Sequence, residues 1–415
     1  MLKDKTELLA PAGDLEKLKT AIRYGADAVY FGGEMFSLRA GAGNLSLDDI
    51  EEGLDFAHER GARGYMTLNV YPHNDDIPQL RSYIENIAHL PIDAFIVSDP
   101  SVIALLKDVI EEPELHLSTQ ANTTNYMAAN FWASQGISRI VAAREMSLAE
   151  IAKMREELAD DVEIEAFVHG AMCISYSGRC LLSNFMAGRD ANKGECTHPC
   201  RWKYALEEEK RPGEYYPIEE DEYGTYILNS RDLCMLDALP DLISSGVRSL
   251  KIEGRMKSAY YVATVVSAYR ALLDEYEKDP AAYVFDPYWF EEMCKASHRE
   301  FTHGFYYAKP TDKDQNYITS AYTREYTFVG LVEGTDEATG LTAVEQRNKF
   351  SVGDTVEIFG PGTKFCEEVI EEMYDGEGQP IESAPHPQQK VLLRLACKTK
   401  EHFMIRRKNE NTLFG

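Results

Sequence analysis

The sequence lacks the patterns that assign a protein to several common classes. No apolar run approaches the roughly 20 residues that a membrane-spanning helix requires. The opening segment, MLKDKTELLAPAG, has no apolar core of the kind found in secretory signals. We therefore expect a cytoplasmic protein without a membrane segment. In that compartment, clustered cysteines bind metals or act in catalysis more often than they form disulfides.

Several catalytic motifs are also missing. His58 and Glu59 are followed by RGAR, so the sequence holds no H-E-x-x-H zinc motif. It holds neither G-x-S-x-G nor a phosphate-binding P-loop, and no G-x-G-x-x-G follows the first predicted strand. A peptidase with this sequence would need a nucleophile outside these motifs. Thr123 and Ser177 can be named, but no pattern supports them.

Positive charge is scarce. The chain has 43 Lys and Arg against 69 Asp and Glu, which gives a formal net charge of −26. This imbalance argues against a surface that binds nucleic acid over its whole extent. It leaves room for a local basic patch, and the segment from Lys398 to Lys408, KTKEHFMIRRK, is a candidate. The alternative for this segment is a solvated edge strand.

Cysteine is rare as well, but it is concentrated. Four of the eight cysteines fall in one segment with the spacing C-x6-C-x15-C-x3-C: Cys173, Cys180, Cys196 and Cys200. Four thiolates in one segment match the ligand set of a closed metal or iron–sulfur site. Structural zinc sites usually pair their ligands as C-x2–4-C, and only the last two cysteines do so, which favours an iron–sulfur cluster over zinc. Buried thiols without a metal are the remaining alternative.

The other four cysteines are scattered. Cys234, in LNSRDLC, is either a structural thiol or a substitute ligand at another strand end. Cys294, Cys366 and Cys397 are isolated, and we expect them to be core thiols.

The first 275 residues alternate apolar strands with amphipathic helices. Leu15, Leu18 and Ile22 form an apolar stripe of helical period, and Gly25 is placed to end that helix. The predicted strands begin near Glu7, Ala28, Tyr65, Ala94, Leu115, Arg139, Glu163 and Ser249. Eight such units predict a (β/α)8 barrel, which typically takes about 250 residues. A doubly wound open sheet is the alternative.

The cysteine-rich segment interrupts this pattern. The seventh strand, EIEAFVHG, ends at Gly170, and residues 171–224 form an insertion at its carboxyl end. Active sites of (β/α)8 barrels lie at that face. We therefore predict a barrel over residues 1–278, a connector of short helices over 279–325, and a small barrel-like β domain over 326–415.

Polar residues follow several predicted strands, which suggests a polar pocket at the barrel mouth. In KIEGR, Lys251 and Arg255 are candidates to bind an anionic ligand and Glu253 to orient it; a salt-bridge lock at the barrel rim is the alternative. His169 is either functional or a packing histidine. The remaining strand-end residues are Gln120, Asn122, Arg144, Glu145, Asn229 and Asp232.

Four segments resemble one known family. ELLAPAGDLEKLKTAIRYGADAVYFGG, HLSTQANTTN, SLKIEGRMKS and the long block EAFVHGAMCISYSGRCLLSNFMAGRDANKGECTHPCRWKY are similar to the collagenase-like peptidase family of unknown catalytic type. The resemblance covers about residues 5–270, and the β domain extends it. The ending CTHPCRWKY with a β domain after the barrel looks most like the family's tRNA-hydroxylating branch. A related branch, UbiU and UbiV, hydroxylates quinone precursors and carries a four-iron cluster, and a longer relative hydroxylates rRNA.

The resemblance implies an activity and a ligand set. It implies a prephenate-dependent tRNA hydroxylase that forms 5-hydroxyuridine at the wobble position, with a 4Fe–4S cluster on Cys173, Cys180, Cys196 and Cys200. Prephenate is a dicarboxylate, so its candidate partners are Arg144, Arg179, Lys251, Arg255 and Gln120, with Glu253 and His169 as catalytic candidates. The family name keeps a peptidase open. The acidic surface keeps open a scaffold role or a paralogous partner subunit.

Overall fold

The computed structural model describes residues 5–37, 44–171, 182–189, 196–197, 205–207, 215–217, 231–308 and 323–409. In this part of the chain, no helix is both long and apolar enough to cross a bilayer.

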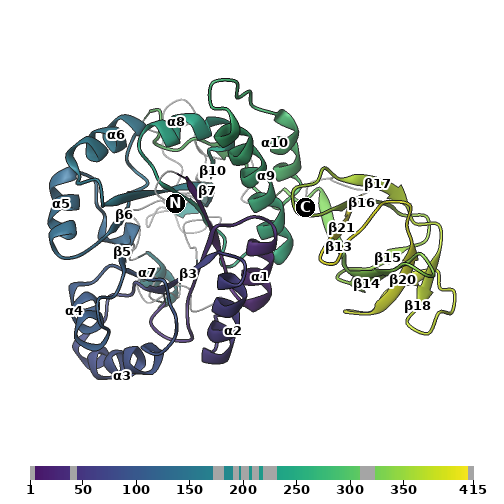
Figure 1. The fold of residues 1–415 in the computed structure, drawn as a ribbon, viewed down its shortest axis with the longest axis horizontal. Helices are drawn as coiled ribbons and strands as arrows, with labels where there is room; N and C mark the ends of the chain where they lie inside the picture. The colour runs from purple at the N-terminus through teal and green to yellow at the C-terminus, as the bar shows by residue number, and fades with distance from the viewer. Residues whose placement is uncertain are drawn as a thin grey trace.

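Eight parallel strands close into a barrel (Figure 1). In the order in which they pair, the strands are β1 (Glu7–Pro11), β2 (Ala28–Phe31), β3 (Arg63–Leu68), β4 (Ala94–Val97), β5 (Leu115–Leu117), β6 (Arg139–Val141), β7 (Glu163–Ala171) and β11 (Ser249–Ile252). Pairing of β11 with both β7 and β1 closes the ring. The predicted (β/α)8 barrel is confirmed, and all strands but β3 begin at the residue predicted.

Helices cover the outside of the barrel (Figure 1). They are α1 (Leu15–Arg23), α2 (Leu47–His58), α3 (Ile77–Ile87), α4 (Pro100–Val109), α5 (Tyr126–Ser134), α6 (Leu148–Glu157), α8 (Leu239–Ser244) and α9 (Ala259–Lys278). Side-chain caps fix where they begin: Asp14 accepts from the Lys17 amide, and Ser46 forms a capping box with Asp49. Gly25 follows α1 with a φ of +108°, a value that favours glycine, so α1 ends where the sequence predicts.

The insertion lies between β7 and β11, as predicted. Its described parts are α7 (Leu182–Ala187), an antiparallel hairpin of β8 (Ala205–Glu207) and β9 (Tyr215–Pro217), and β10 (Asp232–Cys234). Strand β10 runs antiparallel to the end of β7, with Cys234 opposite His169, and β12 (Phe301–Thr302) pairs with β10. Strands β10 and β12 were not predicted, because they lie outside the repeating strand–helix pattern that identified the equally short β5 and β6.

The C-terminal part is a separate antiparallel sheet, as predicted. In order of pairing its strands are β17 (Cys366–Val369), β16 (Thr355–Phe359), β21 (Met404–Lys408), β13 (Tyr326–Asp336), β14 (Leu341–Gln346), β20 (Lys390–Arg394) and β18 (Met373–Asp375). The interpretation of residues 398–408 as a solvated edge strand was wrong for β21. That strand lies between β16 and β13, and the Arg406 side chain on it is fully buried.

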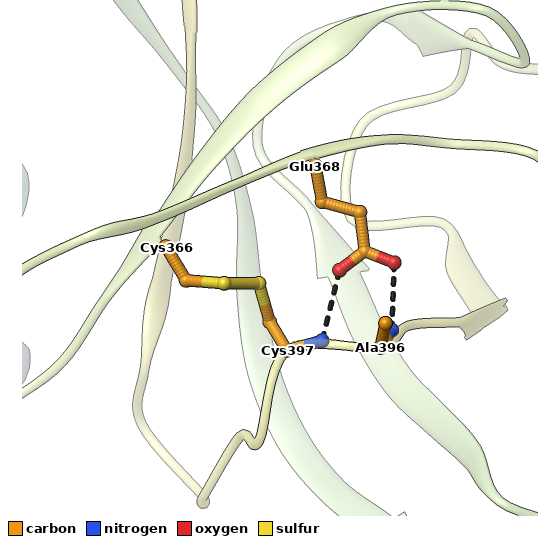
Figure 2. The surroundings of a disulfide bond; sticks show 4 residues. All are labelled: Cys366, Glu368, Ala396 and Cys397. Carbon is orange, nitrogen blue, oxygen red and sulfur yellow. Dashed lines mark hydrogen bonds between the residues drawn. A yellow bond between two sulfur atoms is a disulfide. The ribbon is translucent and has the colours of Figure 1, made fainter.

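A disulfide links Cys366 to Cys397 (Figure 2), so the expectation that both are core thiols was wrong. Cys366 lies on β17, at one end of the sheet, and Cys397 follows β20, next to the other end. The Glu368 carboxylate accepts hydrogen bonds from the amides of Ala396 at 2.6 Å and Cys397 at 3.0 Å. Because the sheet curls, its two ends meet, and residues far apart in the sequence come within bonding distance.

The β domain packs against the barrel on the side of α1, α9 and α10 (Pro287–Cys294) (Figure 1). Phe359 and Met404 of the β domain join the main core cluster of the barrel. The buried Arg406 guanidinium lies 2.6 Å from the carboxylates of both Glu292, on α10, and Glu357, on β16. Arg406 therefore links the β domain to the barrel through two buried ion pairs. Removing one partner would leave a buried charge uncompensated, which is strongly destabilising.

Candidate functional site

Five of the predicted site residues lie at, or just beyond, the carboxyl ends of barrel strands. Gln120 follows β5, Arg144 follows β6, His169 is near the end of β7, and Glu253 and Arg255 follow β11. Because all eight barrel strands are parallel, their carboxyl ends form one face, where active sites of this architecture lie. We call this face, with the residues that directly follow the strands, the barrel mouth.

Arg144 and Glu253 form an ion pair at the barrel mouth. The Arg144 Nη2 lies 2.5 Å from Glu253 Oε2, and Nη1 donates to the Ala171 carbonyl at 2.6 Å. The guanidinium also lies over the Phe167 ring, 3.9 Å from its centre. Arg144 therefore links the ends of three strands and fixes the residue at which the cysteine-rich insertion begins.

Arg255 is the second guanidinium at the barrel mouth, and only 5% of its surface is exposed. It donates to Ser37 Oγ at 2.7 Å, to Asn44 Oδ1 at 2.7 Å and to Thr67 Oγ1 at 3.3 Å. These three hydrogen bonds orient the guanidinium. Ser37, Asn44 and Thr67 were not predicted from the sequence.

Lys251 lies deeper, inside the barrel. Its ammonium is 2.6 Å from Glu165, and Arg139 is 3.4 Å from the same carboxylate and 2.6 Å from Glu7. Burial lowers the pKa of Lys251, and Glu165 opposes that effect. This buried network matches the alternative interpretation of Lys251, a salt-bridge lock, although the structure places it within the barrel and not at its rim.

His169 is buried among aromatic rings below the mouth. The rings of Tyr261, Tyr269 and Phe301 have their centres 5.5 to 5.9 Å from the imidazole. Burial, with smaller contributions from Lys257 and His298, lowers the pKa of His169 to about 3. The imidazole is therefore neutral at physiological pH. In the described part of the chain its Nδ1 has no hydrogen-bond partner.

Buried amide oxygens at the mouth are also unpaired. Among the described residues, the side-chain oxygens of Asn69, Gln120 and Asn122 are buried without a hydrogen-bond partner. Such atoms are costly unless a ligand or water satisfies them. Asn122 also has a φ of +56°, an uncommon conformation that recurs at functional sites. Asn69 follows β3, so the strand-end rule that selected Gln120 could have found it.

Two further strand-end candidates have different surroundings. Glu145, next to Arg144, is partly buried, and burial raises the pKa of its carboxyl. Asp232 is buried on β10, where its Oδ2 accepts from the Arg299 amide at 3.2 Å. Asn229, Ser177 and Arg179 lie outside the described residues.

Of the four clustered cysteines, the structure describes only Cys196; Cys173, Cys180 and Cys200 lie outside the described residues. Cys196 is a partly exposed free thiol. The next residue, Thr197, is anchored to α7, because its amide donates to Ser183 Oγ at 3.1 Å. In the described part, no three His, Cys, Asp or Glu side chains group as a metal site.

Cys234 differs from the cluster in its environment. Its thiol is buried near the Tyr269 hydroxyl and Met293 sulfur, each at 3.9 Å. Burial raises the pKa of Cys234 to about 12, so the thiol stays protonated at neutral pH.

Comparison with known proteins identifies the family. The model of peptidase family U32 matches residues 13–316, and the model of its C-terminal domain matches residues 324–406. The chain is 42% identical over 403 residues to tRNA hydroxylation protein P1 of Bacillus subtilis (strain 168), covering 97% of this chain and 95% of that protein. It is 37% identical to tRNA hydroxylation protein P of Escherichia coli (strain K12), covering 92% of each chain.

A third relative carries a different name. The collagenase of Porphyromonas gingivalis (strain ATCC BAA-308 / W83) is 30% identical over 378 residues, covering 88% of this chain and 89% of that protein. Barrel and β domain together thus match the two models, which confirms the resemblance drawn from the sequence. The chain belongs to peptidase family U32.

Proposed function

We propose that the protein hydroxylates RNA, and that its substrate is the wobble uridine of tRNA, which becomes 5-hydroxyuridine. The observation that carries this proposal is the 42% identity to tRNA hydroxylation protein P1 over 97% of the chain. That similarity includes the barrel mouth and the β domain, so it extends well beyond a shared scaffold.

The barrel mouth supports a small anionic co-substrate, and we propose prephenate. A dicarboxylate can pair with the guanidinium groups of Arg255 and Arg144, which both lie at the barrel mouth. A ligand carboxylate at Arg144 would compete with Glu253, which lies 2.5 Å away. The buried amide oxygens of Asn69 and Gln120 are suited to accept hydrogen bonds from a ligand hydroxyl.

We further propose a 4Fe–4S cluster on Cys173, Cys180, Cys196 and Cys200, with zinc as the alternative metal. The described residues fit this proposal in two respects. The Cys196 thiol is free and partly exposed, and Ala171, which the Arg144 guanidinium holds, is two residues before Cys173. Hydroxylation of a pyrimidine carbon is a two-electron oxidation, so the reaction needs an electron acceptor and an oxygen donor besides the base; a bound iron–sulfur cluster would supply one-electron transfer steps between them.

Residues of the barrel mouth position the groups that the proposed reaction needs. Arg144 holds the start of the cysteine-rich insertion beside Glu253, and Ser37, Asn44 and Thr67 orient Arg255. The neutral His169 can form a hydrogen bond through its unpaired Nδ1, but a pKa of about 3 makes it a weak base, and it carries no imidazolium proton to donate at neutral pH.

A peptidase is the second candidate, because the P. gingivalis relative is named a collagenase. In the described part, Cys234 lines one cavity with His303 and Asp237. A cysteine beside a histidine and an aspartate is a candidate nucleophile. The buried Cys234 thiol has a pKa raised to about 12, which makes it a poor nucleophile. We therefore place the peptidase second. A scaffold role or a paralogous partner subunit is the third alternative.

The test is an assay of purified protein for hydroxylation and metal together. The protein is purified without oxygen, its iron and acid-labile sulfide are measured, and tRNA from a hydroxylation-deficient strain is added with prephenate. Wobble 5-hydroxyuridine, detected by mass spectrometry of the nucleosides and lost in Cys180→Ser, supports the proposal. Unmodified tRNA together with gelatin cleavage that a barrel-mouth substitution abolishes would favour the peptidase instead. Modification only after a second protein is added would favour a partner subunit.

A further inference from the structure

The β domain contains a cavity of about 970 Å³ that is separate from the barrel mouth. Its wall is formed by the segment after β16, the segment between β20 and β21, and the turn between β13 and β14. The disulfide between Cys366 and Cys397 lies in this wall and holds two of these segments together. The wall includes the lysines Lys364, Lys398 and Lys400 and the threonines Thr335, Thr342 and Thr399.

The cavity wall holds three lysines and two glutamates, a small excess of positive charge in a chain whose net charge is −26. Lys398 and Lys400 are exposed, and neither forms an ion pair within the described part of the chain. Lys364 has one exposed partner, Asp286, at 3.4 Å. Of the two acidic residues in the wall, Glu401 lies within the electrostatic reach of Arg23: burial lowers the pKa of Arg23, and Glu401 opposes that effect.

Hydroxyl groups lie beside these lysines. The side chains of Thr335, Thr342 and Thr399 contact one another at 2.9 to 3.3 Å, so three hydroxyls form one cluster in the cavity wall. Lysine ammonium groups with threonine hydroxyls are the side chains that contact phosphate oxygens in nucleic-acid complexes.

We propose that this cavity, which we call the β-domain groove, binds the phosphodiester backbone of the RNA substrate through Lys398, Lys400 and the threonine cluster. The inference rests on the proposed function for the identity of the partner. It adds a second contact region to that function, one that supplies affinity through charge and does not read the base.

The groove lies toward the end of the barrel opposite the mouth. The Tyr24 hydroxyl, just past the end of α1, donates to the carbonyl of His402, which is next to Glu401 in the groove wall. Helix α1 begins after β1, at the mouth end, and nine residues of helix span about 14 Å. An RNA with one base at the mouth must therefore extend along the β domain to reach the groove. We expect groove contacts for a whole tRNA and not for an isolated anticodon loop.

The experiment measures RNA binding by fluorescence anisotropy at several salt concentrations. It compares the wild-type protein, Lys398→Glu/Lys400→Glu and the control Lys153→Glu/Lys278→Glu. The control reverses two exposed lysines of α6 and α9, and α6 lies on the far side of the barrel from the β domain (Figure 1). The probes are unmodified tRNA, its anticodon stem–loop and poly(U).

The groove variant is expected to bind tRNA and poly(U) roughly tenfold more weakly than wild type at about 0.1 M salt. The slope of log K against log salt should fall by about one for each lysine that contacts a phosphate. The control variant should bind like wild type, and the stem–loop should show no difference among the three proteins.

Two results would overturn the inference: equal binding of tRNA and poly(U) by the groove variant and the control, or no RNA binding by wild type. Equal binding by the groove variant and the control would leave the proposed function standing, whereas a wild type that binds no RNA would contradict both. A wild-type protein that binds RNA through Lys398 and Lys400 but hydroxylates no nucleoside would contradict the proposed reaction and keep the groove. A protein that hydroxylates tRNA equally well with and without these lysines would support the proposed reaction and contradict the groove.

Discussion

The guanidinium of Arg255 lies against the backbone of Gly32, in space that any side chain at position 32 would occupy. A Cβ built at Gly32 overlaps both Arg255 Nη2 and the Ser37 hydroxyl, which accepts from Arg255 Nη1 at 2.7 Å. The turn after β2 therefore shapes the space that holds the guanidinium of Arg255, the residue that follows β11. The absence of a side chain at position 32 thus belongs to the anion site proposed above.

Gly32→Ala is expected to displace the Arg255 guanidinium and to weaken prephenate binding about tenfold or more, since a charge-assisted contact is lost or misdirected. Overpacking costs typically about 1–3 kcal/mol, so the fold should survive. Calorimetric titration with prephenate measures the effect. Gly376→Ala is the matched control, because a Cβ there meets its nearest atom only at 4.0 Å and should change neither binding nor stability. Wild-type affinity for prephenate in Gly32→Ala would show that the space at Gly32 does not position the Arg255 guanidinium.

The ion pair of Arg144 and Glu253 leads to a prediction that separates binding from catalysis. Glu253→Gln keeps the size of the side chain but removes the charge that competes for Arg144, so prephenate should bind several-fold more tightly. If Glu253 takes part in the reaction, hydroxylation falls while this affinity rises. Arg144→Gln should lower both, because it removes the guanidinium and its hydrogen bond to Ala171. Weaker prephenate binding by Glu253→Gln would show that the carboxylate contacts the ligand favourably.

His169 gives a prediction about pH. Its pKa is about 3 in the folded protein, where burial lowers it, and about 6.5 in an unfolded chain. Below pH 6.5 the unfolded chain gains a proton that the folded protein lacks, so this residue destabilises the fold increasingly as the pH falls toward 3. At pH 5.5 the penalty is about 1.4 kcal/mol, and it vanishes above pH 7.

Urea unfolding of wild type and His169→Asn at pH 7.5 and pH 5.5 checks this. The free energy of unfolding of wild type, relative to the variant, should be lower at pH 5.5 than at pH 7.5 by about 1.4 kcal/mol. A relative stability that does not change with pH would mean that His169 is protonated or exposed in the folded protein.

The barrel could be predicted from the sequence because its signals are local. The apolar stripe of Leu18 and Ile22 and the left-handed Gly25 lie within one helix and its end. Residues whose roles depend on distant partners were harder to predict. Lys251 follows the same strand-end pattern as Arg255, yet the pleat turns it inward to Glu165, which is 86 positions away. The charge of Arg406 suggested a solvated strand, but Glu292 and Glu357 allow it to be buried.

The disulfide also depends on residues that are distant in the sequence, so it could not be predicted from local patterns. It gives the last prediction. Cys366 and Cys397 are separated by 31 positions, and only the curl of the sheet brings their Cα atoms to 6.2 Å. Closing a loop of this length stabilises a fold by about 3–4 kcal/mol in the chain-entropy model. Reduction, or Cys366→Ser/Cys397→Ser, should therefore destabilise the β domain by about that amount and leave the barrel strands largely unaffected.

Hydrogen exchange of the Ala396 and Cys397 amides gives a local readout, because both donate to Glu368 beside the disulfide (Figure 2). In wild type these amides should exchange slowly, and a dithiol reductant should speed their exchange. The double serine variant should exchange fast with or without reductant, whereas Cys294→Ser, which alters a free thiol, should behave like wild type. Unchanged exchange in the double variant would mean that the Glu368 hydrogen bonds hold the two ends of the sheet together without the disulfide.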